Sequence, residues 1–402
     1  MNILQINTSY QKGGAAKIAQ TIHKKINKKR NHTSFFAFGR GKRSIDGIYK
    51  FTFRPEIYLH GAITRITGYE GIGTYFSTRN LINNIENINI DLIHLHNIHG
   101  CYLNFSFINY LKDNNFPVVW TFHDAWPFTG NCAYFFNCEK WKNGCGNCPN
   151  LKTYPKNYID QSKKMWKKKR KLFASGWEPT IITPSKWLAD KVKKSFLKEH
   201  KIKVINNGVD LNDYKLYDKA KIRKRLNIPI NKKVLLFVAA DLENKRKGTK
   251  YFLKTLKKIA NKNYLIITVG KKFKQKIDTN IDIKQLGYIK DKNYLSKIYS
   301  MVDLYCITSL DDNFPTTVLE SLASGTPVVG FDVGGIKEQV QNECGYVVEP
   351  KNTNELAKKI KLLLENKKLN NKMSKNARKK AVNNYSFKKM VNKYLKLYEN
   401  IV

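Results

Sequence analysis

The sequence is short of acidic side chains. Asp and Glu together number 31 among 402 residues, against 73 Lys and Arg, which gives a formal net charge of +42. A field of this sign attracts polyanions such as nucleic acids, anionic lipids and phosphorylated small molecules. Lys, Asn and Ile are frequent along the whole chain, so we assign part of the charge to a compositional bias rather than to one binding surface.

Long apolar runs are also lacking. No uninterrupted apolar stretch approaches the ~20 residues that a membrane span needs. Residues 1–6 run straight into a strand-like pattern with no basic segment before it, so we expect no secretory signal. These absences predict a cytoplasmic protein, and the positive charge adds peripheral contact with the inner face of the plasma membrane as a second expectation.

Short strand-like segments alternate with helix-like segments in both halves of the chain, which predicts parallel sheets covered by helices on both faces. We expect a doubly wound α/β domain over residues 1–208, a second over 209–385, and a C-terminal helix over 386–402. Ligands of such sheets bind at the carboxyl ends of the strands. The predicted strands are 2–7, 91–95, 118–122, 181–183, 204–206, 234–240, 264–269, 303–307 and 328–331, and one predicted helix covers 187–198.

The most informative motif lies in the second half. A strand ending near Thr308 is followed by Asp311 and Asp312, and Pro315 stands where the next helix begins, a position that suits its fixed φ and missing N–H. The first-turn N–H groups of such a helix can bind phosphate. Glu320 follows about one turn further along, where a carboxylate can accept hydrogen bonds from a ribose diol. An acidic loop that merely caps an ordinary helix is the alternative.

This stretch resembles the nucleotide-sugar site of the retaining GT-B glycosyltransferases of family four, in which an acid, seven residues and a Glu precede Gly-x-Pro-Val-Val. Asp312 and Glu320 hold the two ends here, ahead of residues 325–329. The resemblance implies two facing Rossmann-like domains with a cleft between them, and retaining transfer from a UDP- or GDP-sugar. It implies that Asp312 orients the donor sugar and that Glu320 holds the ribose. The first acid is Asp rather than the usual Glu, so its reach is a methylene shorter. The implied donor site also includes Asn313, Phe314, Pro315, Thr316 and Thr317.

A basic loop after the strand 234–240 fits the same resemblance. Lys247-Gly248 matches the Lys-Gly of the family, whereas the usual Arg position is vacant and Arg246 is the substitute. The resemblance implies that Arg246 and Lys247 act in catalysis, because cations there can stabilise a departing diphosphate. A solvated charge cluster is the alternative. Asp-x-Asp occurs nowhere, so no catalytic metal is expected.

Two glycine pairs and one histidine complete the implied site. Gly13-Gly14 and Gly334-Gly335 resemble family loops that approach the donor, although any tight turn uses glycine in the same way. His123 follows the strand 118–122 and resembles the histidine that contacts the transferred sugar, whereas a structural histidine is the alternative. His94, His96 and His99 match no standard metal spacing and are interpreted as acceptor-site or core histidines.

Four of the seven cysteines lie close together in the sequence. Cys132, Cys138, Cys145 and Cys148 form the pattern C-x5-C-x6-C-x2-C, and four thiolates suit a structural, tetrahedral zinc ion. Reduced thiols in a packed loop and a redox disulfide are the alternatives. The surrounding insertion, residues 126–151, resembles a subgroup of the family linked to capsule, colanic-acid and O-antigen (lipopolysaccharide) synthesis.

A strongly basic segment follows the insertion. Residues 163–171 carry seven basic side chains, with Met165 and Trp166 on an apolar stripe. We favour a helix packed by its stripe, and a surface for anionic lipid is the alternative.

The resemblance therefore implies a hexosyltransferase that acts on a glycan or an undecaprenyl-diphosphate-linked acceptor in cell-surface polysaccharide synthesis. Nucleotide-sugar is its co-substrate, and no nucleic acid is expected to bind. Two alternatives are a basic nucleic-acid-binding protein, on the strength of the +42 charge, and a catalytically inactive transferase-like scaffold, on the strength of Asp312 and the displaced Arg.

Overall fold

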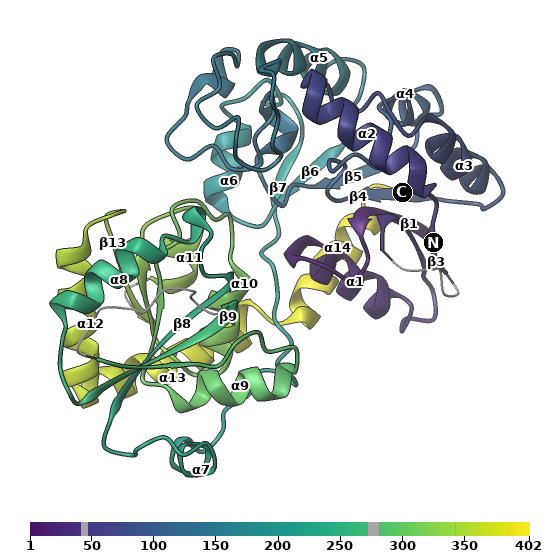
Figure 1. Cartoon of the computed structure of the whole chain (residues 1–402). Helices are drawn as coiled ribbons and strands as arrows, with labels where there is room; N and C mark the ends of the chain where they lie inside the picture. The colour runs from purple at the N-terminus through teal and green to yellow at the C-terminus, as the bar shows by residue number, and fades with distance from the viewer. Residues whose placement is uncertain (42–46, 272–280, 342) are drawn as a thin grey trace. The chain divides into compact units, whose positions relative to one another are not determined.

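The structure is a computed structural model that describes residues 1–41, 47–271, 281–341 and 343–402 (Figure 1). The chain divides into two compact units. The N-terminal unit consists of Met1–Asn206 together with Val391–Val402, and the C-terminal unit is Asn207–Met390. Within the described ranges, no helix combines the length and the apolar character that crossing a bilayer requires.

The N-terminal unit is built on a seven-stranded sheet in the order β3-β2-β1-β4-β5-β6-β7, with every described pair parallel. The strand order reverses between β1 and β4, so polar loops after those strands meet at one edge. The strands are β1 Asn2–Ser9, β2 Thr33–Arg40, β3 Ile48–Lys50, β4 Leu92–Leu95, β5 Val118–Thr121, β6 Thr180–Thr183 and β7 Ile202–Val204. The helices are α1 Gly14–Ile26, α2 Arg54–Thr67, α3 Tyr75–Glu86, α4 Ser106–Asp113, α5 Ser162–Ala174 and α6 Lys186–Val192, with short 3-10 turns η1 Trp126–Phe128 and η2 Lys140–Lys142.

The C-terminal unit repeats this plan with a parallel sheet in the order β10-β9-β8-β11-β12-β13. Its strands are β8 Lys233–Asp241, β9 Tyr264–Lys271, β10 Asp282–Gln285, β11 Leu304–Ile307, β12 Val328–Phe331 and β13 Gly345–Val348. Its helices are α7 Lys219–Arg225, α8 Thr249–Lys258, α9 Lys292–Met301, α10 Thr316–Ala323, α11 Ile336–Val340, α12 Thr353–Glu365 and α13 Lys367–Asn384, and the turn η3 is Lys245–Lys247.

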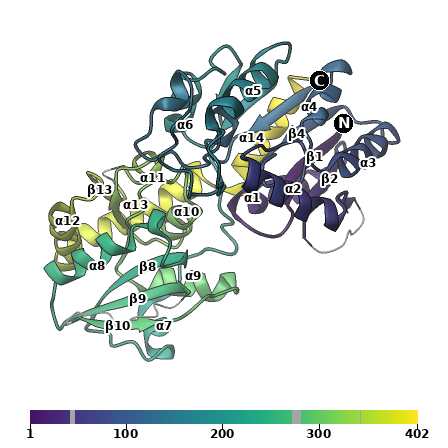
Figure 2. The ribbon, with the colours of Figure 1, turned by 45° about the horizontal axis from the view of Figure 1, so that its top comes forward.

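The central strands are apolar because helices cover both of their faces. All four residues of β4, β5, β11 and β12 are buried, and apolar clusters pack against both faces of the C-terminal sheet. The last helix, α14 Phe387–Glu399, begins in the C-terminal unit and ends in the N-terminal unit. There Tyr394 Oη lies 3.0 Å from Thr121 Oγ1 and Tyr398 Oη lies 2.6 Å from His94 Nδ1. Figure 2 shows the end of the α14 ribbon beside β4.

The expectation of two parallel α/β layers is confirmed, but one predicted helix is wrong in its second half. The segment expected over 187–198 ends as a helix at Val192. Ser195 Oγ donates to Val192 O at 2.7 Å and accepts from Leu197 N at 3.1 Å. Such local side-chain bonds compete with helical ones and stop the helix.

Candidate active site

Three residues that the sequence singled out as catalytic meet in the C-terminal unit. The carboxylate of Asp312, in the loop after β11, accepts from Lys247 Nζ at 2.7 Å and from Arg246 Nη1 at 3.0 Å through the same oxygen. Asp312 and Lys247 are 65 residues apart in the chain. The contact forms because β8 and β11 are neighbours and their carboxyl ends share one edge of the sheet.

Backbone bonds hold the two loops together. Arg246 O accepts from Leu310 N at 2.8 Å, and its guanidinium Nη1 also donates to Asp311 O at 2.8 Å. Gly248 ends the basic turn at φ 66°, and a Cβ there would lie 1.9 Å from Thr308 O. A side chain at this position would therefore be strained and would also collide with the neighbouring loop. Main-chain hydrogen bonds as well as ion pairs therefore hold the basic turn 245–248 against the acidic loop 309–313.

The ion pairs set the protonation of Asp312. Burial opposes its ionisation, but the charges of Lys247 and Arg246 outweigh burial and lower the pKa of Asp312 to about 2. Asp312 is therefore an anion at neutral pH, held by two cations. A diphosphate that reached Arg246 and Lys247 would compete with this carboxylate for the same donors.

The predicted donor-binding residues follow Asp312 into α10. Pro315 precedes the helix at φ −62° and ψ 126°, and α10 begins at Thr316. Gln339 Nε2 donates to Pro315 O at 3.0 Å, and Tyr305 Oη donates to Thr317 Oγ1 at 3.0 Å. These bonds fix the first turn of α10, whose N–H groups are suited to bind phosphate.

The glycine pair after β12 packs on the same acidic loop. A Cβ at Gly334 would lie 1.7 Å from Asp312 O, and Gly335 N donates to Asn313 O at 2.7 Å. Asn313 and Phe314 are buried. Gly334, Gly335, Asn313 and Phe314 therefore shape the loop that carries Asp312.

Glu320 is buried on α10 and has a partner that the sequence did not indicate. The hydroxyl of Tyr214 hydrogen-bonds to Glu320, and burial together with this carboxylate raises the pKa of Tyr214. Tyr214 lies in the polar stretch between the two halves, where neither periodicity nor a motif marks it. The Tyr214 hydroxyl thus holds the Glu320 carboxylate in place.

His123, in the N-terminal unit, is the end of a hydrogen-bonded relay. His123 Nε2 lies 2.9 Å from His96 Nδ1, and His96 Nε2 lies 3.1 Å from the side-chain amide of Gln5. The amide orientation that gives both Gln5 atoms partners directs its NH2 to His96 Nε2 and its oxygen to Ser34 Oγ and His23 N. His96 then carries its proton on Nδ1 and donates to His123 Nε2, so neutral His123 carries its proton on Nδ1.

Burial keeps these histidines neutral. It lowers the pKa of His123 to about 4 and the pKa of His96 well below its usual value. His94, beside His96, is buried and bonds Thr121 Oγ1 at 2.8 Å. The three rings form part of one polar network at the carboxyl ends of β4 and β5.

A second buried network contains His99 and Asp124. His99 Nε2 lies 2.9 Å from Asp124 Oδ2; burial alone would lower the pKa of His99, but Asp124 outweighs it and raises that pKa. Glu70 joins the same edge, because its carboxylate accepts from Gly100 N and from Trp126 Nε1, both at 2.8 Å. Asp124 therefore serves here as the partner of His99.

Gly13 and Gly14 form the turn between β1 and α1. Gly13 has φ 98° and precedes the first helical residue, Gly14. Nothing lies within 4 Å of a Cβ at either residue. The turn therefore leaves open space above the start of α1.

The four cysteines of the insertion line one small cavity of about 10 Å³, together with Trp141 and Ser162. Cys145 Sγ accepts from Gly130 N at 3.2 Å. All seven cysteines are free thiols, and among the described residues no group of three or more His, Cys, Asp or Glu is arranged to hold a metal ion. Zinc stays a prediction here. Cys306 and Cys344 are buried, and Cys101 is partly buried.

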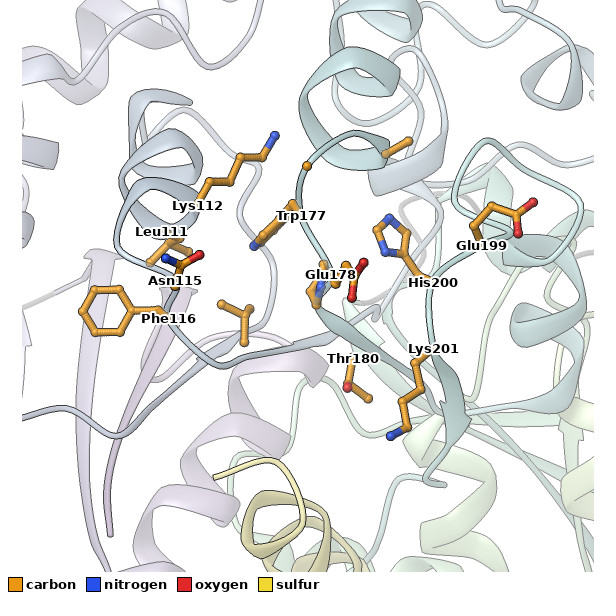
Figure 3. Close-up of a pocket in the computed structure, with 14 residues that line it drawn as sticks. Leu111, Lys112, Asn115, Phe116, Trp177, Glu178, Thr180, Glu199, His200 and Lys201 are labelled. Atoms are coloured by element: carbon orange, nitrogen blue, oxygen red, sulfur yellow. The ribbon is translucent and has the colours of Figure 1, made fainter.

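A larger cavity of about 690 Å³ lies at the opposite end of the N-terminal sheet, around the starts of β5 and β6. Figure 3 shows the side chains that line it, among them Trp177, Glu178, Glu199, His200 and Lys201. None of the predicted site residues lines it. Because ligands of parallel sheets bind at the carboxyl ends of the strands, we do not place the donor there.

Comparison with known proteins matches both halves of the chain to families. Residues 12–213 match the family described as Glycosyltransferase Family 4, and residues 218–380 match Glycosyl transferases group 1. The chain is 28% identical over 422 residues, covering 100% of both chains, to the Escherichia coli K12 protein WcaC, which is provisionally named a colanic acid biosynthesis glycosyl transferase.

Two further relatives are a curated enzyme and a solved structure. The chain is 28% identical over 223 residues to the N,N'-diacetylbacillosaminyl-diphospho-undecaprenol alpha-1,3-N-acetylgalactosaminyltransferase of Campylobacter jejuni, covering 53% of this chain and 58% of that one. The Anabaena protein Alr3699/HepE, solved in complex with UDP-glucose, superimposes with a TM-score of 0.69 at 17% identity over 100% of both chains. This last likeness concerns the fold.

Proposed function

The chain belongs to glycosyltransferase family 4, and on that premise we propose that it transfers a hexose, with retention, from a UDP- or GDP-sugar to an undecaprenyl-diphosphate-linked glycan. The chain is a glycosyltransferase of cell-surface polysaccharide biosynthesis; the donor, the acceptor and the stereochemistry are the proposal. The observation that carries it is the meeting of Asp312, Arg246 and Lys247 beside the first turn of α10.

The charges of this site suit a departing diphosphate. In the transfer, the bond between the sugar C1 and the diphosphate oxygen breaks, and the acceptor oxygen bonds C1 on the same face. The acceptor proton leaves with the diphosphate. Negative charge grows on the leaving oxygen, and we assign its stabilisation to Arg246, Lys247 and the N–H groups after Pro315. Asp312 is released from the two cations as the diphosphate engages them and is then available to the sugar hydroxyls.

The remaining residues have binding roles in this proposal. We assign the ribose diol to Glu320, whose carboxylate is already held by Tyr214. His123 is assigned to the transferred sugar, and as a neutral imidazole it would act as a hydrogen-bond partner rather than as a cation. Gly13, Gly14, Gly334 and Gly335 are assigned to close backbone approach.

The test is thermal-shift binding to UDP, GDP, ADP, CMP and their sugars without added metal, on the wild type and on Glu320→Gln. We expect stabilisation by one nucleotide class, reduced at least about tenfold in apparent affinity by the substitution, because a hydrogen bond between a charged group and a ribose hydroxyl contributes about 1.5–3 kcal/mol. Glu365→Gln is the matched control, since Glu365 also accepts from a tyrosine hydroxyl, that of Tyr264 at 2.8 Å.

Two results would contradict the proposal. One is no response of the wild type to any nucleotide, alongside tight, salt-sensitive binding to DNA or RNA. The other is a nucleotide response that Glu320→Gln and Glu365→Gln change equally. Once the donor is known, proton NMR of the first product formed reads the anomeric configuration and tests retention.

We also propose a structural zinc ion in the insertion. Its support is the donor chemistry, because four thiols line a cavity about the size of one small sphere. The thiols would have to draw together around the ion. With four sulfur ligands no position is left for substrate, so the role would be to fix the insertion.

A further inference from the structure

Helix α2 has its apolar and polar faces inverted. Its buried face carries Ile57 and the polar residues His60 and Thr64. Its outward stripe carries Tyr58, Leu59 and Ile66, which are 77%, 62% and 61% exposed. A helix on a globular protein ordinarily buries its apolar stripe. Here the unit leaves that stripe in water.

Neighbouring segments extend the same apolar surface. Ten of the sixteen exposed large hydrophobic side chains in the described part of the chain lie in two stretches, 53–76 and 154–159. The first stretch contains α2 itself, and its last residue is bonded to that helix, because Phe76 N donates to Glu56 Oε1 at 3.0 Å. The second stretch contacts the other end of α2, where Tyr158 N donates to Arg65 O at 2.9 Å. We call this the α2 surface; Figure 1 shows α2 along the outside of the N-terminal unit. Its exposed residues are Phe53, Tyr58, Leu59, Ile66, Ile72, Tyr75, Phe76, Tyr154, Tyr158 and Ile159.

The composition of the α2 surface is that of a protein that lies on a membrane. Six of its ten members are Tyr or Phe. Aromatic rings favour the boundary between lipid headgroups and acyl chains. Exposed apolar side chains that gather in one region of a protein surface mark binding sites, whereas single scattered ones do not.

Positive charge borders this surface. Arg54 and Arg65 are exposed at the two ends of α2, and the exposed side chains that follow the 154–159 stretch on α5 include Lys163, Lys164 and Lys167. The nearby acids have other partners. Glu56 accepts from Phe76 N and Ser77 N, and Asp160 accepts from Cys148 N and Ser162 N. These two carboxylates bind backbone N–H groups and stay anionic, but the five basic side chains outnumber them, so an anionic surface would meet a net positive charge here.

The basic segment itself is not the apolar part of this surface. In α5, Met165, Trp166 and Phe173 are buried, and Lys169 Nζ is buried against Trp126 O at 2.8 Å and Thr129 O at 3.1 Å. The packed-helix interpretation of residues 163–171 thus accounts for the stripe. Only the outer lysines of α5 are left to contact lipid.

The α2 surface is connected to the polar edge of the N-terminal sheet. Tyr154, a member of the surface, places its hydroxyl 3.4 Å from His99 Nδ1. Glu70, which follows α2, binds Gly100 N and Trp126 Nε1 at the same edge. A lipid-linked substrate needs this continuity, because its tail stays in the bilayer while its sugar head reaches the site.

We propose that the α2 surface docks this protein on an anionic lipid bilayer, with α2 lying in the plane of the headgroups. The inference rests on the proposed function in one respect, that a lipid-linked acceptor supplies the reason for docking. Binding needs both the apolar stripe and the cations, since either signal alone gives weak, reversible attachment.

The experiment measures co-sedimentation of the full chain with vesicles of phosphatidylcholine and phosphatidylglycerol at about 7:3, or of phosphatidylcholine alone. The test variant is Tyr58→Ser/Leu59→Ser. The matched control is Ile230→Ser/Tyr288→Ser, which removes two side chains of 65% and 67% exposure from the C-terminal unit. We expect the test variant to lower the partition coefficient at least about tenfold and the control to leave it within about twofold.

Charge is tested separately with Arg54→Gln/Arg65→Gln. This variant should lose binding to the anionic vesicles by about thirtyfold, because two basic residues near an anionic surface are removed, while its weak binding to phosphatidylcholine alone stays as in the wild type. High salt should weaken the wild type in the same direction.

Two outcomes would overturn the inference. The first is wild-type vesicle binding by Tyr58→Ser/Leu59→Ser. The second is a wild type that is dimeric by light scattering, a test variant that is monomeric, and no vesicle binding by either, which would make the α2 surface an interface between two copies. Nucleotide binding is measured without vesicles, so a wild type that responds to a nucleotide but does not bind vesicles rejects docking alone. A wild type that binds vesicles but responds to no nucleotide rejects the proposed function alone.

Discussion

Replacing Asp312 by Asn tests the ion pairs of the candidate site directly. Lys247 and Arg246 lower the pKa of Asp312 from 3.8 to about 2, and one pKa unit corresponds to about 1.4 kcal/mol. The side chain is only 15% exposed, so solvent screening removes little of this. Because the folded pKa lies below the unfolded one, the stabilisation is present above pH 3.8 and is lost as pH falls toward 2. At pH 7 the variant should lose about 2 kcal/mol of unfolding free energy.

The two units can be followed separately during urea unfolding. All six tryptophans lie between residues 120 and 187, in the N-terminal unit, so their fluorescence reports that unit, while far-ultraviolet circular dichroism reports both. Asp312→Asn should shift the dichroism transition by about 1 M urea, for a slope of about 2 kcal/mol/M, and leave the fluorescence transition in place. Asp282→Asn is the control, because the Asp282 carboxylate, which pairs with Lys232, is 72% exposed and the pair should contribute less than about 1 kcal/mol.

The same variant should separate binding from transfer. Without the Asp312 carboxylate, Arg246 and Lys247 are uncompensated, so the Kd for the donor diphosphate nucleotide should fall severalfold by calorimetry. Transfer should nevertheless slow at least about tenfold in kcat, because the group assigned to orient the sugar is weakened. Unchanged stability at pH 7 together with weaker nucleotide binding would refute the reasoning. That result would mean that Arg246 and Lys247 do not form ion pairs with Asp312 in solution.

Two shorter predictions concern the N-terminal unit. Imidazole NMR signals that disappear in His123→Asn are those of the His123 ring. They should show a neutral ring protonated on Nδ1 that does not titrate between pH 8 and about 5, because burial lowers the pKa of His123 to about 4. A titration midpoint near 6.5 would contradict this. Elemental analysis of protein purified without chelator should find one zinc per chain. Cys145→Ser should lower both the zinc content and the melting temperature, since structural zinc contributes to folding. Protein that carries no zinc as purified, and whose melting temperature does not change on treatment with reductant and chelator, would exclude the zinc site.

The sequence was sufficient for the layers of the fold because parallel strands buried on both faces are short and continuously apolar. The segments 118–122 and 328–331 coincide with β5 and β12 to within one residue. Edge strands are less visible for the same physical reason. β3 and β10 are only partly buried, and residues such as Tyr49 and Lys284 give no continuous apolar run.

Pairing partners could not be predicted, because they depend on which loops the topology brings together. Nothing near Glu320 in the sequence points to Tyr214, and no spacing rule connects Gln5 to His96 or to His123. Helix α2 was not among the predicted elements, and its orientation depends on packing in the same way. An apolar stripe predicts a buried face, and only the structure shows which way that face is turned.

The two departures from the family pattern are in contact with each other. Asp312 stands where the family has a longer Glu, and Arg246 stands for an Arg whose usual position is vacant. Each departure alone favours an inactive scaffold, because one loses reach and the other loses a cation. Yet Arg246 Nη1 lies 3.0 Å from the Asp312 carboxylate, and Lys247 Nζ meets the same oxygen at 2.7 Å. Because Arg246 still reaches the shorter Asp312, the site keeps its balance of positive and negative charge. This coupling argues for an adapted donor site, since in a scaffold free of catalytic demand the two changes would have no reason to meet.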